Sequence, residues 1–472
     1  MDEIVRNTED VMLSNLDFCL NSTASYVQNR RASTFFCSGS NEYSPAGVRV
    51  IKIPISTESG WLDPETLRVQ FTVNNKESGA AKFLRPLSGA WCFINRARLL
   101  IGSQICEDIL EYNRCHEMFY QLSPENIKRN IDAENFGEVF DFYLGSLPDA
   151  IDTTDIAAPN TYTDPQKQTD IKFSGIKNSG KRTVSFKPLF GLLNQPKWIP
   201  LKYAGGIVLE LELVNTFGEP IMDGEATVYD TFTAAKSSSN WAITNVQVKA
   251  DIVELDSQTT EVFAQHLLRD NGSLDIQFNN FISQVQSLPT GATDVNINVQ
   301  RTVSRLATVF VTLYRKLPDT AGAYSKFWNT FYNPLSKANG IRQDDGDEMQ
   351  FSLNIAGKVI PEYPINSQSE FFTELQKAVG LYSSNFHSIG IRPNGLGSYN
   401  DSRFIIGINC EKALGATFTG IENKSGGLTH IKLRANDSSS TTFTNGIADT
   451  MHIVMVNDQV VKIKATGVEI RD

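Results

Sequence analysis

The sequence has no run of about 18 consecutive apolar residues, so it predicts no helix that crosses a membrane. The first ten residues, M-D-E-I-V-R-N-T-E-D, are acidic and polar with no apolar centre, and we expect no secretory signal. Basic residues are also in short supply, because 43 lysines and arginines face 53 aspartates and glutamates, for a net charge of −10. Binding nucleic acid over a broad surface requires clustered lysine and arginine, so this class of protein is disfavoured, sequence-specific binding included.

Cysteine and histidine are scarce, and neither is spaced for metal binding. The cysteines are scattered through apolar or strand-like segments, so we expect reduced, buried thiols and no disulfide frame. They are Cys19, Cys37, Cys92, Cys106, Cys115 and Cys410. The histidines do not stand at ligand spacing from one another or from a cysteine. They are His116, His266, His387, His430 and His452. We therefore predict no metal site and no cofactor.

Two motifs that would indicate ligand binding are incomplete. Residues 175–182, G-I-K-N-S-G-K-R, nearly match a phosphate-binding loop, but Arg182 stands where a serine or threonine hydroxyl must bind the metal. The following T-V-S-F alternates like a strand, whereas phosphate binding requires a helix N-terminus there. This pattern favours a basic surface hairpin.

The cluster D-D-G-D-E at Asp344–Glu348 lacks the twelve-residue spacing of a calcium loop and is typical of a solvated acidic loop. A glycosidase acid/base pair stays open as an alternative, because a sequence does not fix the separation of two carboxylates. The G-x-S-x-G motif of a serine hydrolase is absent. We identify no catalytic, cofactor-binding or metal-binding residue and expect no enzyme.

Alternation of apolar and polar residues at every second position is the dominant pattern. Over 67–73, Leu, Val, Phe and Val alternate with Arg, Gln and Thr. The same alternation recurs at 209–213, 246–252, 274–278, 309–313, 351–355 and 461–465. One apolar and one polar face per strand is typical of antiparallel sheets that pack as a sandwich. Because strands do not alternate with long helices, a doubly wound nucleotide-binding sheet is disfavoured.

Helices are few and short. The pattern predicts one over Glu107–Tyr120, a short one from Ser123, one over Thr259–Arg269 and one over Ser367–Val379. The last is the clearest, because its Ser367 stands three residues before a glutamate and forms a capping box.

The chain repeats one organisation twice. Residues 47–255 and 271–472 each hold about eight strand candidates, which fits two sandwiches joined by a helical linker at 256–270. Residues 1–46 are polar and weakly patterned, so we interpret them as an extended arm, with a disordered tail as the alternative. Two long polar stretches, 145–180 and 316–348, are expected to form loops at one end of the sandwiches.

Four stretches share apolar spacing and a few residues with one protein family. They are Ala90–Tyr112, with an Ile-Gly-small-Gln turn; Val184–Leu213, with an aromatic-rich segment before Pro-Leu; Trp241–His266, with Leu-Asp followed by Phe-Ala-Gln; and the glutamine-rich Phe281–Gln286. In this order they resemble the double jelly-roll major capsid proteins, the lineage of adenovirus-type capsids, large nucleocytoplasmic DNA viruses, virophages and polinton-like viruses.

The resemblance implies an all-β fold of two tandem eight-stranded jelly-roll sandwiches with short helical insertions. It further implies a homotrimeric, pseudo-hexagonal capsomer that tiles the icosahedral shell of a virion assembled inside the host cell. The implied partners are further copies of the chain, neighbouring capsomers, minor capsid and penton proteins, and an internal membrane beneath the shell. The long loops would form the outer end, and the arm would run underneath. Two alternatives stay open: a carbohydrate-binding or carbohydrate-active double sandwich, and a minor or vertex capsid component.

Overall fold

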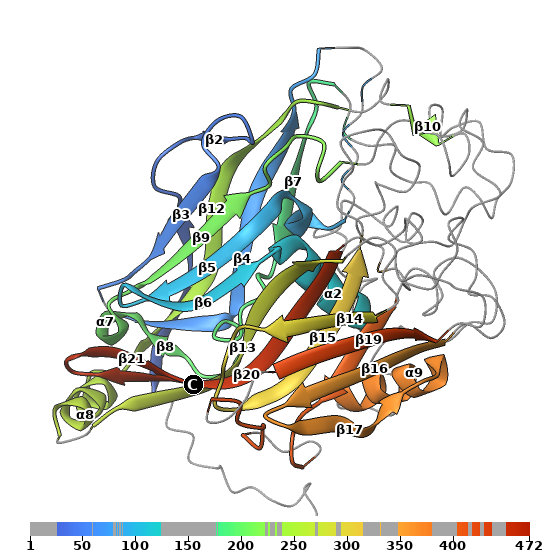
Figure 1. Ribbon diagram of the computed structural model, residues 1–472. Helices are drawn as coiled ribbons and strands as arrows, with labels where there is room; N and C mark the ends of the chain where they lie inside the picture. Colours follow the sequence, from blue (N-terminus) through green and yellow to red (C-terminus); the bar gives the residue numbers. More distant parts are fainter. Residues whose placement is uncertain are drawn as a thin grey trace, which may run out of the picture.

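A computed structural model gives the fold of the chain (Figure 1). It describes residues 26–58, 60–78, 82, 84, 86, 88–123, 176, 178–221, 225–226, 232–233, 238–269, 272–288, 294–314, 331, 348–379, 404–413, 418–424, 429–436 and 450–472. Most of the two polar stretches expected to form loops, the helix expected beyond Ser123, and the residues Cys19 and His387 lie outside these ranges.

The N-terminal half forms a barrel of two antiparallel sheets. The first sheet has the order β1 (Val27–Phe36), β12 (Trp241–Leu255), β4 (Trp61–Asn75) and β7 (Lys181–Phe186), with β2 (Glu42–Tyr43) beside β12 and β8 (Ile199–Pro200) beside β4. The second sheet has the order β3 (Val50–Ile55), β9 (Ile207–Leu213), β5 (Ile94–Ile101) and β6 (Gln104–Leu110). A separate small pair consists of β10 (Glu225–Ala226) and β11 (Phe232–Thr233).

The C-terminal half forms a second barrel beside the first (Figure 1). One sheet has the order β13 (Leu274–Ser287), β20 (Thr450–Lys464), β15 (Leu306–Tyr314) and β18 (Ile405–Asn409), with β21 (Gly467–Arg471) beside β20. The other has the order β14 (Asp294–Val299), β19 (Thr429–Asn436), β16 (Glu348–Ile355) and β17 (Lys358–Ile365).

The two barrels have the same topology. When the eight main strands of each barrel are numbered in chain order, both barrels have one sheet in the order 1-8-3-6 and one in the order 2-7-4-5. Strands exchanged between two facing sheets in this way make a jelly roll. The predicted fold class, two tandem eight-stranded jelly-roll sandwiches with short helical insertions, is therefore confirmed.

Within the described ranges the helices are α2 (Tyr112–Leu122), α7 (Leu201–Ala204), α8 (Ser257–Leu268), α9 (Gln368–Ala378) and the 3-10 turn η2 (Ala90–Phe93). The capping box of α9 is confirmed, because Ser367 Oγ accepts a hydrogen bond from Glu370 N at 3.3 Å and Glu370 Oε2 accepts one from Ser367 N at 3.3 Å. The helix predicted from Glu107 is wrong in its first turn. Residues 104–110 pair with β5 as a strand, and Glu111, with a left-handed φ of 47°, separates that strand from α2. None of the helices in the described ranges is long and apolar enough to cross a membrane.

The second half of the expected arm belongs to the first barrel. Residues 27–36, inside the stretch 1–46, form β1 and pair with β12 from Val27↔Leu255 to Phe36↔Gln247. Because β1 is an edge strand with mostly exposed side chains, it lacks the alternation that identifies buried strands. The chain therefore enters the barrel at Val27 and not at residue 47. The linker and second-barrel boundaries stay predictions.

The alternation expected over 309–313 does not separate buried from exposed residues, because that segment belongs to β15, a strand covered on both faces. In β3 and β14 every second residue is buried. By contrast, all nine residues of β15 and the first ten of β20 are buried. One face of these two strands lies inside the second barrel, and the other packs against the first barrel. One apolar core therefore extends through both barrels.

Candidate functional site

The junction between the two barrels is held by aromatic, cation–π and hydrogen-bond contacts. Helix α2 of the first barrel lies against the second, as Figure 1 shows. The ring of Phe119 lies 4.9 Å from that of Phe281 and 5.4 Å from that of Phe310, centroid to centroid. The buried guanidinium of Arg114 lies 4.3 Å from the centroid of the Tyr314 ring. These aromatic and cation–π contacts attach α2 to the sheet formed by β13, β20 and β15.

The backbone of the edge strand β6 is also hydrogen-bonded across the junction. Ser283 Oγ accepts a hydrogen bond from Leu110 N at 2.7 Å and donates one to Leu110 O at 2.8 Å. Lys197 Nζ donates to Asp275 O at 3.0 Å further along β13. A backbone group left unpaired in a buried place costs about as much as a lost hydrogen bond, so the Ser283 hydroxyl fixes where the barrels meet.

The segment 187–194 forms a wedge between the barrels, and one buried carboxyl group holds it. The buried side chain of Glu107 accepts hydrogen bonds from Gly191 N at 2.8 Å and from Leu192 N at 2.9 Å. Leu189 N donates to the Tyr112 hydroxyl at 2.8 Å. A β-carbon added to Gly191 would lie 1.7 Å from the backbone oxygen of Asn279 in β13. Only glycine fits at this contact.

Burial raises the pKa of Glu107 to about 8, against the two backbone N–H groups that lower it. Between pH 4.5 and 8, Glu107 therefore keeps its proton in the folded state, whereas in the unfolded chain, where its pKa has the ordinary value near 4.5, it has lost it. The resulting stability is complete below pH 4.5 and is lost as the pH rises through 8.

We expect Glu107→Gln to cost about 1–3 kcal/mol near pH 6, because the amide nitrogen faces a backbone donor. The same change should flatten the decline of unfolding free energy between pH 6 and 9, measured by urea denaturation. Glu212→Gln, on the charged outer face of the same sheet, is the control and should keep the wild-type slope. A Glu107→Gln protein that declines as steeply as wild type would contradict this assignment.

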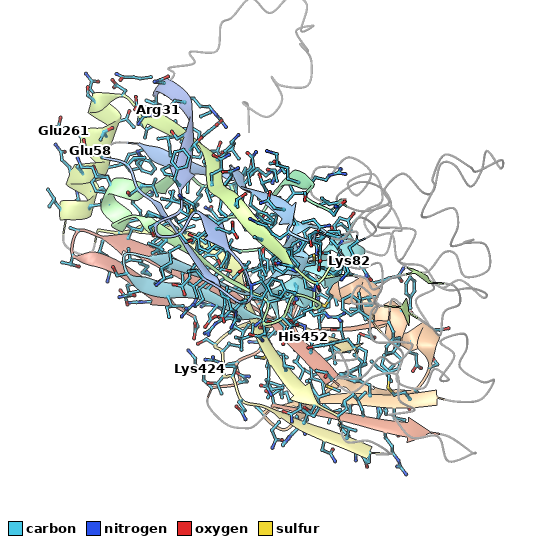
Figure 2. All side chains as sticks on the ribbon, turned by 90° about the horizontal axis from the view of Figure 1, so that it is seen from above. Arg31, Glu58, Lys82, Glu261, Lys424 and His452 are labelled. Atoms are coloured by element: carbon cyan, nitrogen blue, oxygen red, sulfur yellow. The ribbon has the colours of Figure 1, made fainter. Side chains whose placement is uncertain are left out.

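Two histidines lie at the junction. His452, on β20 opposite Thr312, has no exposed surface, and neither ring nitrogen has a hydrogen-bond partner among the described residues. Figure 2 shows it between the barrels. Burial and then the charge of Arg114 lower the pKa of His452 to about 3. His116 stacks on Trp91 at 4.1 Å and faces Lys187 O at 3.2 Å, and burial lowers its pKa to about 4. Both rings are neutral at pH 7.

The other sequence candidates are not brought together. In the phosphate-loop candidate, Ile176 bridges to Leu84 and residues 181–186 form β7, so a strand follows the loop as the pattern predicts. Residues 344–347 of the acidic cluster lie outside the described ranges, and Glu348 begins β16. Among the five cysteines that the structure describes, all are free thiols, and all but Cys37 are buried. Across the described ranges, no group of three or more His, Cys, Asp or Glu side chains is arranged to hold a metal ion.

The sequence patterns did not identify the junction residues, although one pattern points to them. The run T-M-H-I-V-M-V-N-D-Q at 450–459 is apolar at both odd and even positions. A strand with two apolar faces must be buried on both. The pattern therefore indicates a second packing partner for this strand, and the partner is the first barrel, whose Arg114 on α2 and Leu110 on β6 lie near His452.

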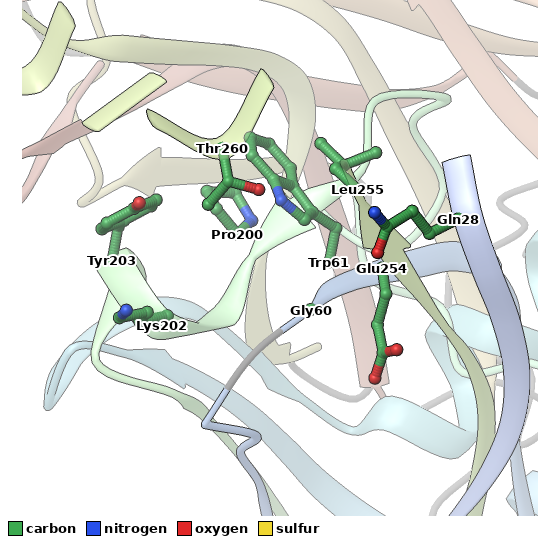
Figure 3. Close-up of a pocket in the computed structure, with 9 residues that line it drawn as sticks. All are labelled: Gln28, Gly60, Trp61, Pro200, Lys202, Tyr203, Glu254, Leu255 and Thr260. Atoms are coloured by element: carbon green, nitrogen blue, oxygen red, sulfur yellow. The ribbon is translucent and has the colours of Figure 1, made fainter. Parts of the chain in front are cut away.

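A cavity of about 230 Å³ opens at one end of the first barrel, beside α8. Figure 3 shows Lys202 and Tyr203 on one side of it and Gln28, Glu254 and Leu255 on the other. The remaining lining residues are Gly60, Trp61, Pro200 and Thr260.

No protein-family model and no curated protein sequence matches the chain. Solved structures do. A structure of PBCV-1 Vp54 fitted into a reconstruction of the virophage Sputnik has a TM-score of 0.59 at 11% identity, over 96% of this chain and 99% of that chain. A model of the PBCV-1 virus capsid has a TM-score of 0.57 at 10% identity, over 96% and 99%. A structure of the Sputnik virophage has a TM-score of 0.53 at 10% identity, over 98% and 92%. The whole chain thus has the fold of these viral structures.

Proposed function

We propose that this chain is the major capsid protein of an icosahedral DNA virus and that it resides in the shell of the virion. The observation that carries the proposal is the repeated 1-8-3-6 and 2-7-4-5 strand order in two barrels of one chain. Support comes from the similarity in fold to the PBCV-1 capsid and to the Sputnik virophage along nearly the whole chain. A shell component must pack against copies of itself, and the rigid junction between the barrels gives it a fixed shape for that purpose.

The proposed assembly unit is a homotrimer. Three subunits of two barrels each place six similar barrels around a threefold axis, which gives a pseudo-hexagonal outline that can tile a shell. The edge strand β17 supports contact between subunits, because Val359 is 41% and Tyr363 78% exposed there. Exposed apolar side chains on one strand favour contact with another chain through those side chains.

The same proposal includes no catalysis and no cofactor. Its further partners are neighbouring capsomers, minor capsid and penton proteins and an internal membrane beneath the shell, and the chain would be made and assembled inside the host cell. These partners follow from the family resemblance alone.

Mass photometry of the purified chain should give particles of three times 52.4 kDa, and negative-stain images should show pseudo-hexagonal outlines. We expect the double change Val359→Glu and Tyr363→Glu to weaken trimer formation at least about tenfold, because it places two charges in the contact.

The matched control is Leu268→Glu on α8, which changes a side chain as exposed as Tyr363 and should leave the trimer intact. A wild-type monomer at micromolar concentration would refute the trimer. A monomer that cleaves glycans and loses that activity on Asp345→Asn would favour the carbohydrate alternative. A low copy number per virion would favour a minor or vertex component.

A further inference from the structure

The cavity beside α8 has one apolar wall and one charged rim. The indole of Trp61 packs on Phe263 of α8 with ring centroids 4.9 Å apart, and Tyr203 and Pro200 complete the apolar lining. On the rim, Glu254 lies 3.5 Å from Arg31, whereas the exposed Lys202 has no ion pair within the described ranges. A dry cavity of about 150 Å³ accepts a benzene ring, so a space of about 230 Å³ has room for one aromatic side chain.

The chain begins its first strand at the rim of this cavity. Asp256 N donates a hydrogen bond to Tyr26 O at 2.8 Å, and Gln28 Nε2 donates to Asp256 Oδ1 at 3.2 Å. Gln28 itself lines the cavity. The 25 residues that precede Tyr26 therefore start from a fixed point beside it.

Those 25 residues have the chemistry that the cavity would recognise. They contain one aromatic residue, Phe18, inside the apolar decapeptide V-M-L-S-N-L-D-F-C-L at 11–20. They carry five carboxylates and one arginine, and Asp17 stands directly before Phe18. An aromatic ring suits the Trp61 and Tyr203 wall, and a carboxylate beside it suits Lys202.

We propose that the cavity is a docking site for the chain's own N-terminal segment, with Phe18 inserted beside Trp61 and Asp17 facing Lys202. Seven residues lie between Phe18 and Tyr26, so the two are eight steps apart along the chain and span at most about 29 Å, which is enough to turn back to the cavity rim. A short tether gives the segment an effective concentration in the millimolar range, so the intrachain contact prevails over the same segment from a dilute second copy.

The test uses the full chain with Phe18→p-benzoylphenylalanine, irradiated and mapped by mass spectrometry. We expect cross-links to peptides that contain Trp61 or Tyr203, in a product that keeps the mobility of a single 52.4 kDa chain. Lys202→Glu should lower the cross-link yield roughly two- to tenfold, because a rim ion pair becomes a repulsion, while Lys202→Arg should keep it. The probe at Thr8 is the position control and should not reach the cavity peptides.

Cross-links elsewhere, or none, would overturn the proposal, and so would a product with the mobility of two chains. A second measurement avoids the probe: Phe18→Ala should speed amide hydrogen exchange in α7 and at the start of β1, and unchanged exchange would count against docking. The docking site is independent of the trimer, so mass photometry of the same variants separates a failure of this inference from a failure of the proposed capsid function.

Discussion

Gly191→Ala is expected to lower the free energy of unfolding by at least about 3 kcal/mol, at the upper end of the usual cost of overpacking. The added methyl would lie 1.7 Å from the oxygen and 2.7 Å from the carbonyl carbon of Asn279, and both atoms are backbone. Neither side of the contact can move away without breaking hydrogen bonds. Strand β13 pairs with β20 at all fourteen of its positions, and Gly191 N is held by the buried Glu107. The strain must therefore separate the barrels or break the Glu107 hydrogen bonds.

The matched control for Gly191→Ala is Gly218→Ala, because a β-carbon there would meet nothing within 4 Å. Urea denaturation should find that variant within about 0.5 kcal/mol of wild type. If Gly191→Ala proved as stable as Gly218→Ala, the segment 187–194 would be able to move away from β13, and the packing between the barrels would be looser than its contacts indicate.

The strands were predictable from the sequence where the burial of one face leaves a period of two. Residues 67–73 and 209–213 show this, since each lies in a strand with one face in the core. The period fails at both extremes of burial. It disappears in β1 because the edge strand exposes most of its side chains, and it disappears over the first ten residues of β20 because both faces are covered there.

The sequence did not predict the junction or the cavity, because the residues that form them lie far apart along the chain. Leu110 and Ser283 meet across 173 residues, and the cavity is lined from β1, β4, β8, β12 and two helices. No local pattern encodes such contacts, because each partner alone looks like an ordinary strand or loop residue. Position 191 illustrates this, because glycine is required there by a backbone atom of Asn279 in the other barrel.

Acidification is expected to destabilise the junction through His452. The folded-state pKa of His452 is about 3, below the ordinary value of 6.5, so the unfolded chain binds a proton first as the pH falls. The contribution of His452 to the free energy of unfolding is complete above pH 6.5. It declines between pH 6.5 and pH 3 by roughly 1.4 kcal/mol per pH unit. This amounts to roughly 3 kcal/mol at pH 4. His116 acts in the same direction between 6.5 and about 4, with a smaller expected effect because it keeps some solvent contact.

His452→Met isolates this effect, because it keeps the volume and removes the titration. Relative to wild type, the variant should gain roughly 2 kcal/mol of unfolding free energy on going from pH 7 to pH 5. Glu107 opposes the histidines over this range, but it is present in both proteins and cancels in the comparison. Leu110 O, toward which the ring lies, keeps its hydrogen bond from Ser283 Oγ.

The control for acid sensitivity is His266→Gln, which removes a histidine that lies exposed on α8, away from the contact between the barrels. Parallel curves for wild type and His452→Met would mean that the junction admits water or opens before the histidine is protonated. The carboxylates do not obscure the comparison, because wild type and His452→Met contain the same ones. Glu469, whose pKa is lowered to about 2 by its pairing with Arg471 and Lys464, also keeps its charge over this range. Between pH 6.5 and 5, a difference between the two proteins therefore reports the protonation of His452 at the contact between the barrels.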